Sequence, residues 1–232
     1  MNFTFGIVSN GKNYTVLNEC LKSIIFQNIK NSEIIVVGNI DKSKINNIKK
    51  NINFIDFDEN IKPGWITKKK NLITKNSNWE NIVYLHDYLA LDKNWYKGFL
   101  KFGNNFEIAM NKILNPDKTR YRDWTLWPHN NSFIDEIIED NACLLPYKIS
   151  NLSKYMYISG AYWVCKKTVM EKYPLNEDLV WGEAEDVEWS KRVRAEYTFK
   201  FNKFSKTNLL KQKNPQFKKI SKNQLKRILS GL

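Results

Sequence analysis

Acidic side chains are concentrated in one short stretch of the 232-residue chain, where positions 183–188 include four acids. A carboxylate in a binding site can act as a general base, taking the proton of a hydroxyl group while its oxygen attacks an electrophile. Acids also occur in the first turn of helices, where they interact favourably with the helix dipole, and that role needs no substrate. Four acids between Trp181 and Trp189 exceed what capping requires, so we interpret the cluster as catalytic.

A second polar group, His86-Asp87-Tyr88, directly follows the apolar run Asn81 to Leu85. A carboxylate at a strand end can anchor Mg²⁺ or Mn²⁺, because these hard cations prefer oxygen ligands and share their coordination shell with phosphate oxygens. The alternative is a strand-end turn in which Asp87 caps the next segment. The residues alone leave both interpretations open.

The elements that must position these groups follow an alternating order in the first half of the chain. We expect strands at Phe3 to Val8, Glu33 to Val37, Asn53 to Phe57 and Asn81 to Leu85, and helices at Val16 to Ile25 and Trp65 to Thr74. This order predicts an α/β fold with a mostly parallel, doubly wound sheet between helix layers. Ligands of such sheets bind beyond the carboxyl ends of the strands. The polar and small residues expected to converge there are Ser9, Gly38, Asp56, Phe57 and Asp87.

In the second half we expect helices at Trp95 to Phe102 and Val187 to Ala195, and strands at Phe106 to Ile113 and Ile158 to Cys165. The apolar residues of the loop between Arg120 and Asn131 show no clear helical or strand periodicity. This loop carries Arg120, Arg122, Asp123, Trp124, Trp127 and His129. We interpret it as a candidate lid in which an arginine meets a phosphate group, with a purely structural loop as the alternative.

The net charge of +13 comes almost entirely from the C-terminal part of the chain. Positions 191–232 hold 13 Lys or Arg residues and one acid, Glu196. Pro215 to Leu229 has the pattern of a basic amphipathic helix, so we interpret about 203–232 as a basic helical extension of a single domain spanning 1–232. This extension either docks on the core or contacts an anionic membrane surface. No nucleic-acid recognition motif accompanies the charge, so no nucleic-acid partner is expected.

Three cysteines, Cys20, Cys143 and Cys165, are widely spaced and flanked by apolar residues. This favours buried thiols in a reducing compartment over a disulfide framework. The chain shows neither a signal-peptide pattern at Met1 nor a run of about 20 apolar residues. We therefore expect a cytoplasmic protein that is either free or peripheral at the inner face of a membrane.

Three features together resemble the GT-A glycosyltransferases, most closely family 2, over nearly residues 3–195. The first is the opening segment with Leu21-Lys22-Ser23-Ile24, Gln27 and Glu33-Ile34-Ile35-Val36-Val37; the second is Lys70-Asn71 ahead of His86-Asp87-Tyr88; the third is Ser159-Gly160-Ala161 followed by Trp181-Gly182-Glu183-Ala184-Glu185-Asp186-Val187-Glu188-Trp189. The resemblance implies a Rossmann-like GT-A fold. It also implies transfer of a sugar from a nucleoside diphosphate, usually UDP, to an acceptor hydroxyl with inversion.

By the same resemblance, Asp186 is the general base, and Glu185 positions the acceptor or serves as the alternate base. A divalent cation, Mn²⁺ or Mg²⁺, is implied at Asp87; because only one carboxylate is present, the alternatives are weak binding, His86 as a second ligand, and no metal ion. The family usually has Asp-x-Asp here, whereas this chain has His and Tyr at the outer places.

The resemblance also assigns the two halves of a substrate site. The implied donor residues are Ser9, Gly38, Asp56, Phe57, Lys70, Asn71, His86 and Asp87, and the implied acceptor residues are Trp181, Gly182 and Glu183. The implied acceptor is a glycan or a lipid-linked molecule, in glycan or surface polysaccharide synthesis.

Other functions fit the sequence less well. A dinucleotide-dependent oxidoreductase needs a Gly-x-Gly-x-x-Gly turn after its first strand, and this chain has none there. A hydrolase is disfavoured because no Gly-x-Ser-x-Gly motif or His-rich metal site occurs. A non-catalytic nucleotide or carbohydrate binder of the same fold remains the alternative, because the Asp-x-Asp motif is incomplete.

Overall fold

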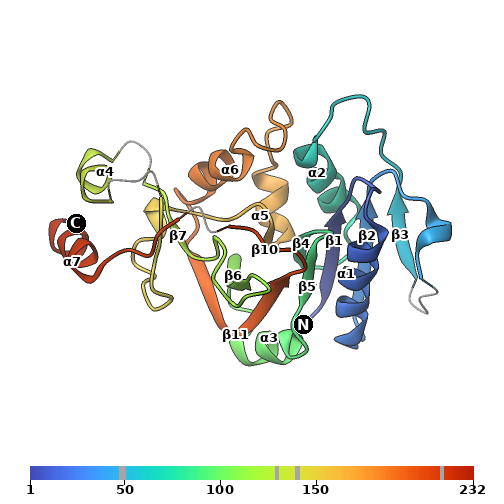
Figure 1. Cartoon of the computed structure of the whole chain (residues 1–232), viewed down its shortest axis with the longest axis horizontal. Coiled ribbons are helices and arrows are strands. Elements are labelled where there is room, and N and C mark those ends of the chain that lie inside the picture. The colour runs from blue at the N-terminus through green and yellow to red at the C-terminus, as the bar shows by residue number, and fades with distance from the viewer. Residues whose placement is uncertain (47–50, 129–130, 139–141, 215–216) are drawn as a thin grey trace.

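The computed structural model describes residues 1–46, 51–128, 131–138, 142–214 and 217–232, in which eight strands form one large twisted sheet (Figure 1). In spatial order these are β3 (Ile52–Ile55), β2 (Ser32–Val37), β1 (Phe3–Val8), β4 (Asn81–His86), β10 (Tyr162–Lys166), β6 (Ile108–Leu114), β11 (Phe199–Leu209) and β5 (Leu89–Leu91). The first four are mutually parallel, and β11 is parallel to β6. Strand β10 is antiparallel to both neighbours, and β5 is antiparallel to β11. The predicted mostly parallel α/β sheet is confirmed.

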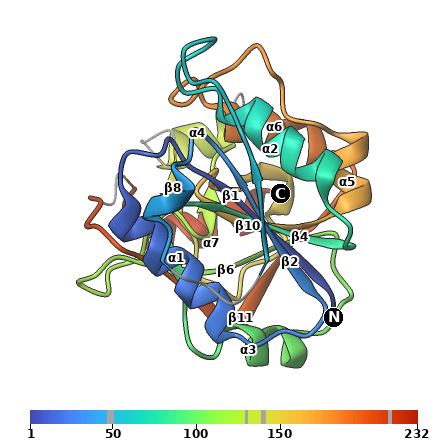
Figure 2. The same ribbon diagram turned by 90° about the vertical axis from the view of Figure 1, so that its right-hand side faces the viewer.

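Helices cover both faces of this sheet, and a small second sheet lies beside it (Figure 2). The helices are α1 (Tyr14–Phe26), α2 (Ile66–Asn76), α3 (Trp95–Phe102), α4 (Ser132–Ile138), α5 (Lys167–Lys172), α6 (Glu185–Val193) and α7 (Lys222–Gly231), with single 3₁₀ turns η1 (Lys42–Lys44) and η2 (Ser153–Tyr155). The small sheet has the order β8 (Cys143–Leu144), β7 (Thr125–Leu126), β9 (Met156–Tyr157).

Strand β1 shows why helices are needed on both sides. Its side chains alternate between the faces, as in any strand. On one face, the ring of Phe5 lies 5.6 Å from that of Trp95 in α3. On the other face Gly6 meets Ile73 of α2 so closely that an added Cβ would lie 2.2 Å from its side chain. Every residue of β1 is buried, and the continuous apolar run in the sequence reflects this two-sided burial.

The predicted elements of the first half are confirmed within two residues at each end. In the second half, the expected strand at Ile158 to Cys165 begins only at Tyr162. The preceding Ser159-Gly160-Ala161 is instead a turn between β9 and β10. The three cysteines are buried, as expected.

The C-terminal segment differs from the sequence prediction. Residues 203–209 are not part of a helical extension, because they form the second half of β11 in the large sheet, between β6 and β5. Lys203 and Lys206 are exposed while Ser205, Thr207 and Leu209 are buried, so a strand underlies what resembled a basic tail. Only α7 of the expected extension is helical, and Pro215 lies outside the described residues.

Helix α7 packs against α4. Its N-terminus is closed by a capping box between Ser221 and Gln224, and the Gln224 side chain donates to the carbonyl of Ile137 at 2.9 Å. Ile228 is fully buried in this contact, whereas Leu229 and the chain end are exposed. In the part of the chain that is described, no helix is long and apolar enough to cross a membrane.

Candidate functional site

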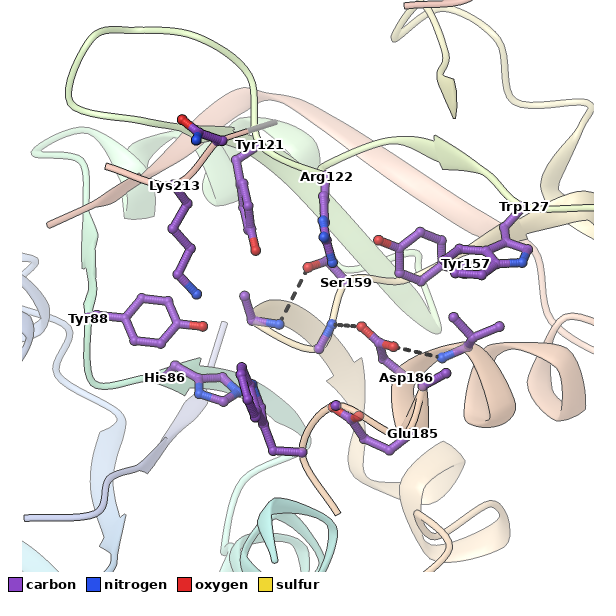
Figure 3. A pocket seen from close by; sticks show the side chains of 17 residues that line it. His86, Tyr88, Tyr121, Arg122, Trp127, Tyr157, Ser159, Glu185, Asp186 and Lys213 are labelled. Carbon is purple, nitrogen blue, oxygen red and sulfur yellow. Dashed lines mark hydrogen bonds between the residues drawn. The ribbon is translucent and has the colours of Figure 1, made fainter. Parts of the chain in front are cut away.

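A pocket of about 580 Å³ opens beyond the carboxyl end of β4 (Figure 3). Its walls come from the end of β4, the turn before β10, the N-terminus of α6, the loop around residues 121–127 and the segment after β11. Five of the predicted site residues line it: His86, Trp181, Gly182, Glu185 and Asp186. The fold therefore brings Glu185 and Asp186 of the acidic cluster and His86 at the end of β4 into one cavity, whereas the residues predicted to converge at the strand ends do not line it: Ser9, Gly38, Asp56, Phe57 and Asp87.

Asp186 is held by two backbone groups. One carboxylate oxygen accepts the N–H of Gly160 at 2.7 Å, and the other accepts the N–H of Val187 at 2.9 Å. Each oxygen retains a further lone pair for a substrate proton. Burial raises the pKa of Asp186 above its ordinary value, although the Gly160 hydrogen bond and the charge of Lys70 oppose this shift. A raised pKa makes the carboxylate a stronger base.

Glu185 lies beside Asp186 at the pocket wall and is 6% exposed. Burial raises the pKa of Glu185, and the neighbouring charge of Asp186 adds to this effect. Both residues belong to the first turn of α6, which starts after Ala184 in a left-handed conformation with φ of 57°. That backbone turn directs the two carboxylates toward the turn that contains Gly160.

Lys70 lies behind the pocket wall rather than in the pocket. Its side chain is buried, and Nζ donates to the carbonyl of Gly160 at 2.8 Å and lies 4.6 Å from the centre of the Trp163 ring. Burial lowers the pKa of Lys70 to about 8, while Glu185 and Asp186 act in the opposite direction. Lys70 therefore supports the two carboxylates from behind, whereas the sequence predicted a contact with the donor diphosphate.

A second group of predicted residues meets at the neighbouring strand ends. The Ser9 hydroxyl donates to a carboxylate oxygen of Asp87 at 2.6 Å. The Ser9 carbonyl accepts Lys69 Nζ at 2.8 Å. A Cβ on Gly38 would lie 2.3 Å from the same carbonyl, so only glycine fits there. These contacts join the ends of β1, β2 and β4 next to the pocket, and a role of these residues in donor binding stays a prediction.

The remaining predicted residues lie elsewhere. Asp56 is exposed at the end of edge strand β3, and Phe57 is buried beneath Lys69, whose Nζ lies 5.1 Å from the ring centre. The Asn71 side chain binds the backbone of Leu175 twice: its NH₂ donates to the Leu175 carbonyl, and its amide oxygen accepts the Leu175 N–H. Glu183 is exposed, and its carboxylate accepts the N–H of Val180 at 2.9 Å.

Helix α2 fixes the loop that carries Trp181. Lys62, Trp65 and Thr67, at and before its N-terminus, donate to backbone carbonyls of residues 177–179. The N–H of Trp181 donates to the Gly64 carbonyl at 2.8 Å. The indole itself remains 65% exposed at the pocket mouth. A rigid backbone thus presents a flat apolar surface to solvent.

Several pocket residues were not assigned a role from the sequence. They are Tyr88, Tyr121, Tyr157, Ser159 and Lys213. Arg122 of the suspected lid loop also lines the pocket, whereas His129 of that loop lies outside the described residues. The alternation of buried and exposed residues along β11 was the signal that could have placed the segment around Lys213 beside the sheet edge.

The predicted divalent cation finds a poor set of ligands. In the described ranges, no three His, Cys, Asp or Glu side chains are grouped so that they could hold a metal ion. One oxygen of Asp87 is taken by the Ser9 hydroxyl, and Tyr88 stands where the family has its second carboxylate. The cation at Asp87 and His86 stays a prediction that the donor set does not favour.

Comparison with known proteins identifies the fold. No protein-family model and no curated protein sequence matches the chain. Among solved structures, residues 1–349 of S. aureus TarS in complex with UDP match with a TM-score of 0.59 and 13% sequence identity. The match covers 90% of this chain and 61% of that structure, so the chain spans less than two thirds of its length. The chain therefore has a glycosyltransferase fold of the GT-A type.

Replacing Glu185 with Gln should stabilise the protein at about pH 7.5. Because the pKa of Glu185 is raised in the folded state, ionisation costs stability as the pH rises through that pKa. Glutamine stays neutral and avoids this cost. The urea midpoint of Glu185→Gln should exceed that of the wild type at about pH 7.5, and the difference should shrink once the pH falls below the ordinary carboxyl pKa of 4.5.

Glu183→Gln provides the matched control, because this neighbouring acid is exposed and its hydrogen bond to Val180 survives the substitution. Its free energy of unfolding should stay within about 0.5 kcal/mol of that of the wild type. A less stable Glu185→Gln at about pH 7.5 would show that the carboxylate is stabilising where it lies.

Proposed function

We propose that this chain is a glycosyltransferase that moves a sugar from a nucleoside diphosphate, most often UDP, to an acceptor hydroxyl with inversion. The observation that carries the proposal is Asp186: a half-buried carboxylate, fixed by two N–H groups, in a pocket beyond the carboxyl end of β4. The GT-A fold and the UDP complex of the TarS fragment support the donor class.

In the proposed reaction the acceptor hydroxyl oxygen attacks the anomeric carbon of the donor sugar. The bond from that carbon to the diphosphate oxygen breaks, its electron pair goes to the phosphate, and the hydroxyl proton passes to Asp186. Inversion needs only one carboxylate, because the displacement is direct. Glu185 positions the acceptor, and Ser9, Gly38 and Asp87 form the neighbouring donor side.

We further propose that the acceptor is a glycan or a lipid-linked sugar, within glycan or surface polysaccharide synthesis. The exposed indole of Trp181 at the pocket mouth supports a sugar acceptor, since aromatic faces pack against apolar ring surfaces. Gly182, which also lines the pocket, has φ of 93° and leaves space beside the indole.

The general base is tested by Asp186→Asn. We expect kcat for transfer, measured as UDP release from a panel of UDP-sugars with saccharide acceptors, to fall about 10²- to 10⁴-fold. UDP affinity measured by calorimetry should stay within about twofold, because the donor side does not include this carboxylate. Glu188→Gln, on the same helix but outside the pocket, is the control and should keep wild-type turnover.

Two results would contradict this assignment. Wild-type turnover in Asp186→Asn would remove Asp186 from the role of base. Donor binding by the wild type without turnover for any acceptor tested would favour the non-catalytic binder.

Trp181→Ala tests the acceptor side. Loss of one stacked aromatic contact should raise the acceptor KM about 10-fold while the donor KM and the melting temperature stay unchanged, because the indole is mostly exposed. Initial-rate kinetics with each substrate varied in turn separates the two constants. An unchanged acceptor KM, or an equal rise in both, would argue against a role in acceptor binding.

We also propose that α7 brings the protein to an anionic membrane surface. Helix α7 presents Lys222, Lys226 and Arg227 beside the exposed Leu229 while remaining docked on α4. Each basic residue contributes about 1 kcal/mol on such a surface. Replacing all three with Ala should weaken co-sedimentation with phosphatidylglycerol-containing vesicles about 100-fold.

Vesicles of pure phosphatidylcholine should bind neither the wild type nor the triple variant of α7. The matched control replaces three exposed lysines at and within α3, namely Lys93, Lys97 and Lys101, which removes the same charge elsewhere. An equal loss in both triple variants would mean that overall charge, rather than α7, determines binding.

A further inference from the structure

The departing diphosphate of the proposed reaction requires positive charge at the pocket. A nucleoside diphosphate leaves slowly unless a cation stabilises the charge that develops on it. Divalent metal ions or cationic side chains can supply that charge. Asp87 is the carboxylate expected to hold a metal ion. The groups around Asp87 therefore indicate whether a metal ion or cationic side chains supply the charge.

Asp87 is surrounded by cations of the protein itself. The charges of Lys69, Lys211 and Lys213 act on its carboxylate, and the Ser9 hydroxyl occupies one of its oxygens. Three ammonium groups near one carboxylate repel a divalent cation rather than attract it. Lys69 is committed to Glu59 and to the Ser9 carbonyl, which leaves the two lysines that follow β11.

Lys213 lies beside Tyr88, which stands at the position where the family has its second metal-binding carboxylate. Its Nζ lies 3.9 Å from the centre of the Tyr88 ring, whose other neighbours include the His86 ring at 5.2 Å. Lys213 lines the pocket, whereas Lys211 is exposed. The Lys213 amino group therefore lies over the aromatic residue that replaces a metal-binding carboxylate. Burial and the charges of Lys211 and Arg122 lower the pKa of Lys213 to about 8, and a bound diphosphate would favour its charged form.

The backbone fixes Lys213 at this position. Antiparallel pairing of β11 with β5 ends with Leu209 opposite Leu89, and the next N–H, of Leu210, donates to the Tyr88 carbonyl at 2.9 Å. The N–H of Lys213 then donates to the Asn115 side chain at 2.9 Å. Sheet pairing and a side-chain clamp thus hold this lysine against the pocket.

Arg122 enters the pocket from the loop that also carries Tyr121, next to Lys213 (Figure 3). The loop is braced by Asp123, a fully buried carboxylate that pairs with Arg120 at 2.6 Å and accepts the Ile113 N–H. Arg122 has φ of 38°, a left-handed conformation that is uncommon for a residue with a side chain. Its Nε is buried and has no hydrogen-bond acceptor among the described residues, so the guanidinium has capacity for an anion.

We propose that Lys213 and Arg122 bind the donor diphosphate and stabilise its departure in place of a divalent metal ion. The proposal rests on the glycosyltransferase function proposed above. It assigns binding roles to one residue of the basic C-terminal region and one of the suspected lid loop. Tyr88 orients Lys213 by stacking under it, which explains an aromatic residue where a carboxylate would bind metal.

UDP binding measured by calorimetry in EDTA and in Mn²⁺ tests the proposal. The wild type should bind UDP in EDTA with an affinity within about twofold of that in Mn²⁺. Lys213→Gln and Arg122→Gln should each weaken binding in EDTA about 10- to 100-fold, the loss of a charge-assisted contact to phosphate. Lys203→Gln, an exposed lysine earlier on β11, should bind as the wild type does.

The outcomes separate this proposal from the proposed function. Binding that requires Mn²⁺ would overturn the cationic role and leave the glycosyltransferase proposal standing. Absence of binding under both conditions, for UDP and for the other nucleoside diphosphates, would refute the donor site and this inference with it. Wild-type affinity in both Lys213→Gln and Arg122→Gln would also overturn it, and unchanged melting temperatures would show that the variants are folded.

Discussion

The backbone of Gly160 makes the contacts on which the rest of the site depends. Its carbonyl accepts the buried Lys70 ammonium, and its N–H donates to Asp186 on the other side. Buried charges are tolerated only when they are paired and hydrogen-bonded. The backbone of this one residue therefore links the cation of α2 to the carboxylates of α6. A Cβ at position 160 would lie about 3.1–3.2 Å from both acids, so a larger residue would have to displace them slightly.

The position of Gly160 is determined by the antiparallel strand β10. This strand pairs with β4 on one side and β6 on the other, so the turn that precedes β10 lies beside the carboxyl end of β4. The carboxylates thereby face His86 and the donor side rather than a separate cavity. In a wholly parallel sheet the carboxyl end of β10, rather than the turn that precedes it, would lie at this edge.

The charge distribution of the chain takes on a spatial meaning in the fold. The basic C-terminal region divides into a strand through the core, a helix docked on α4, and the segment between them that returns to the pocket. Acids of α6 on one wall oppose Lys213 and Arg122 on the other. Such a polarised cavity suits a reaction that removes a proton at one end and releases an anion at the other.

The sequence by itself determined the α/β class, the elements of the first half and the acidic cluster, because apolar periodicity and strand-end residues are local signals. It could not place Lys70 behind the pocket or Lys213 within it. Lys70 is set by helix–turn packing against Gly160, and Lys213 by the pairing of β11 with β5 across more than a hundred residues. Only the tertiary structure decides such contacts, because strand pairing between distant segments depends on the whole sheet rather than on local sequence.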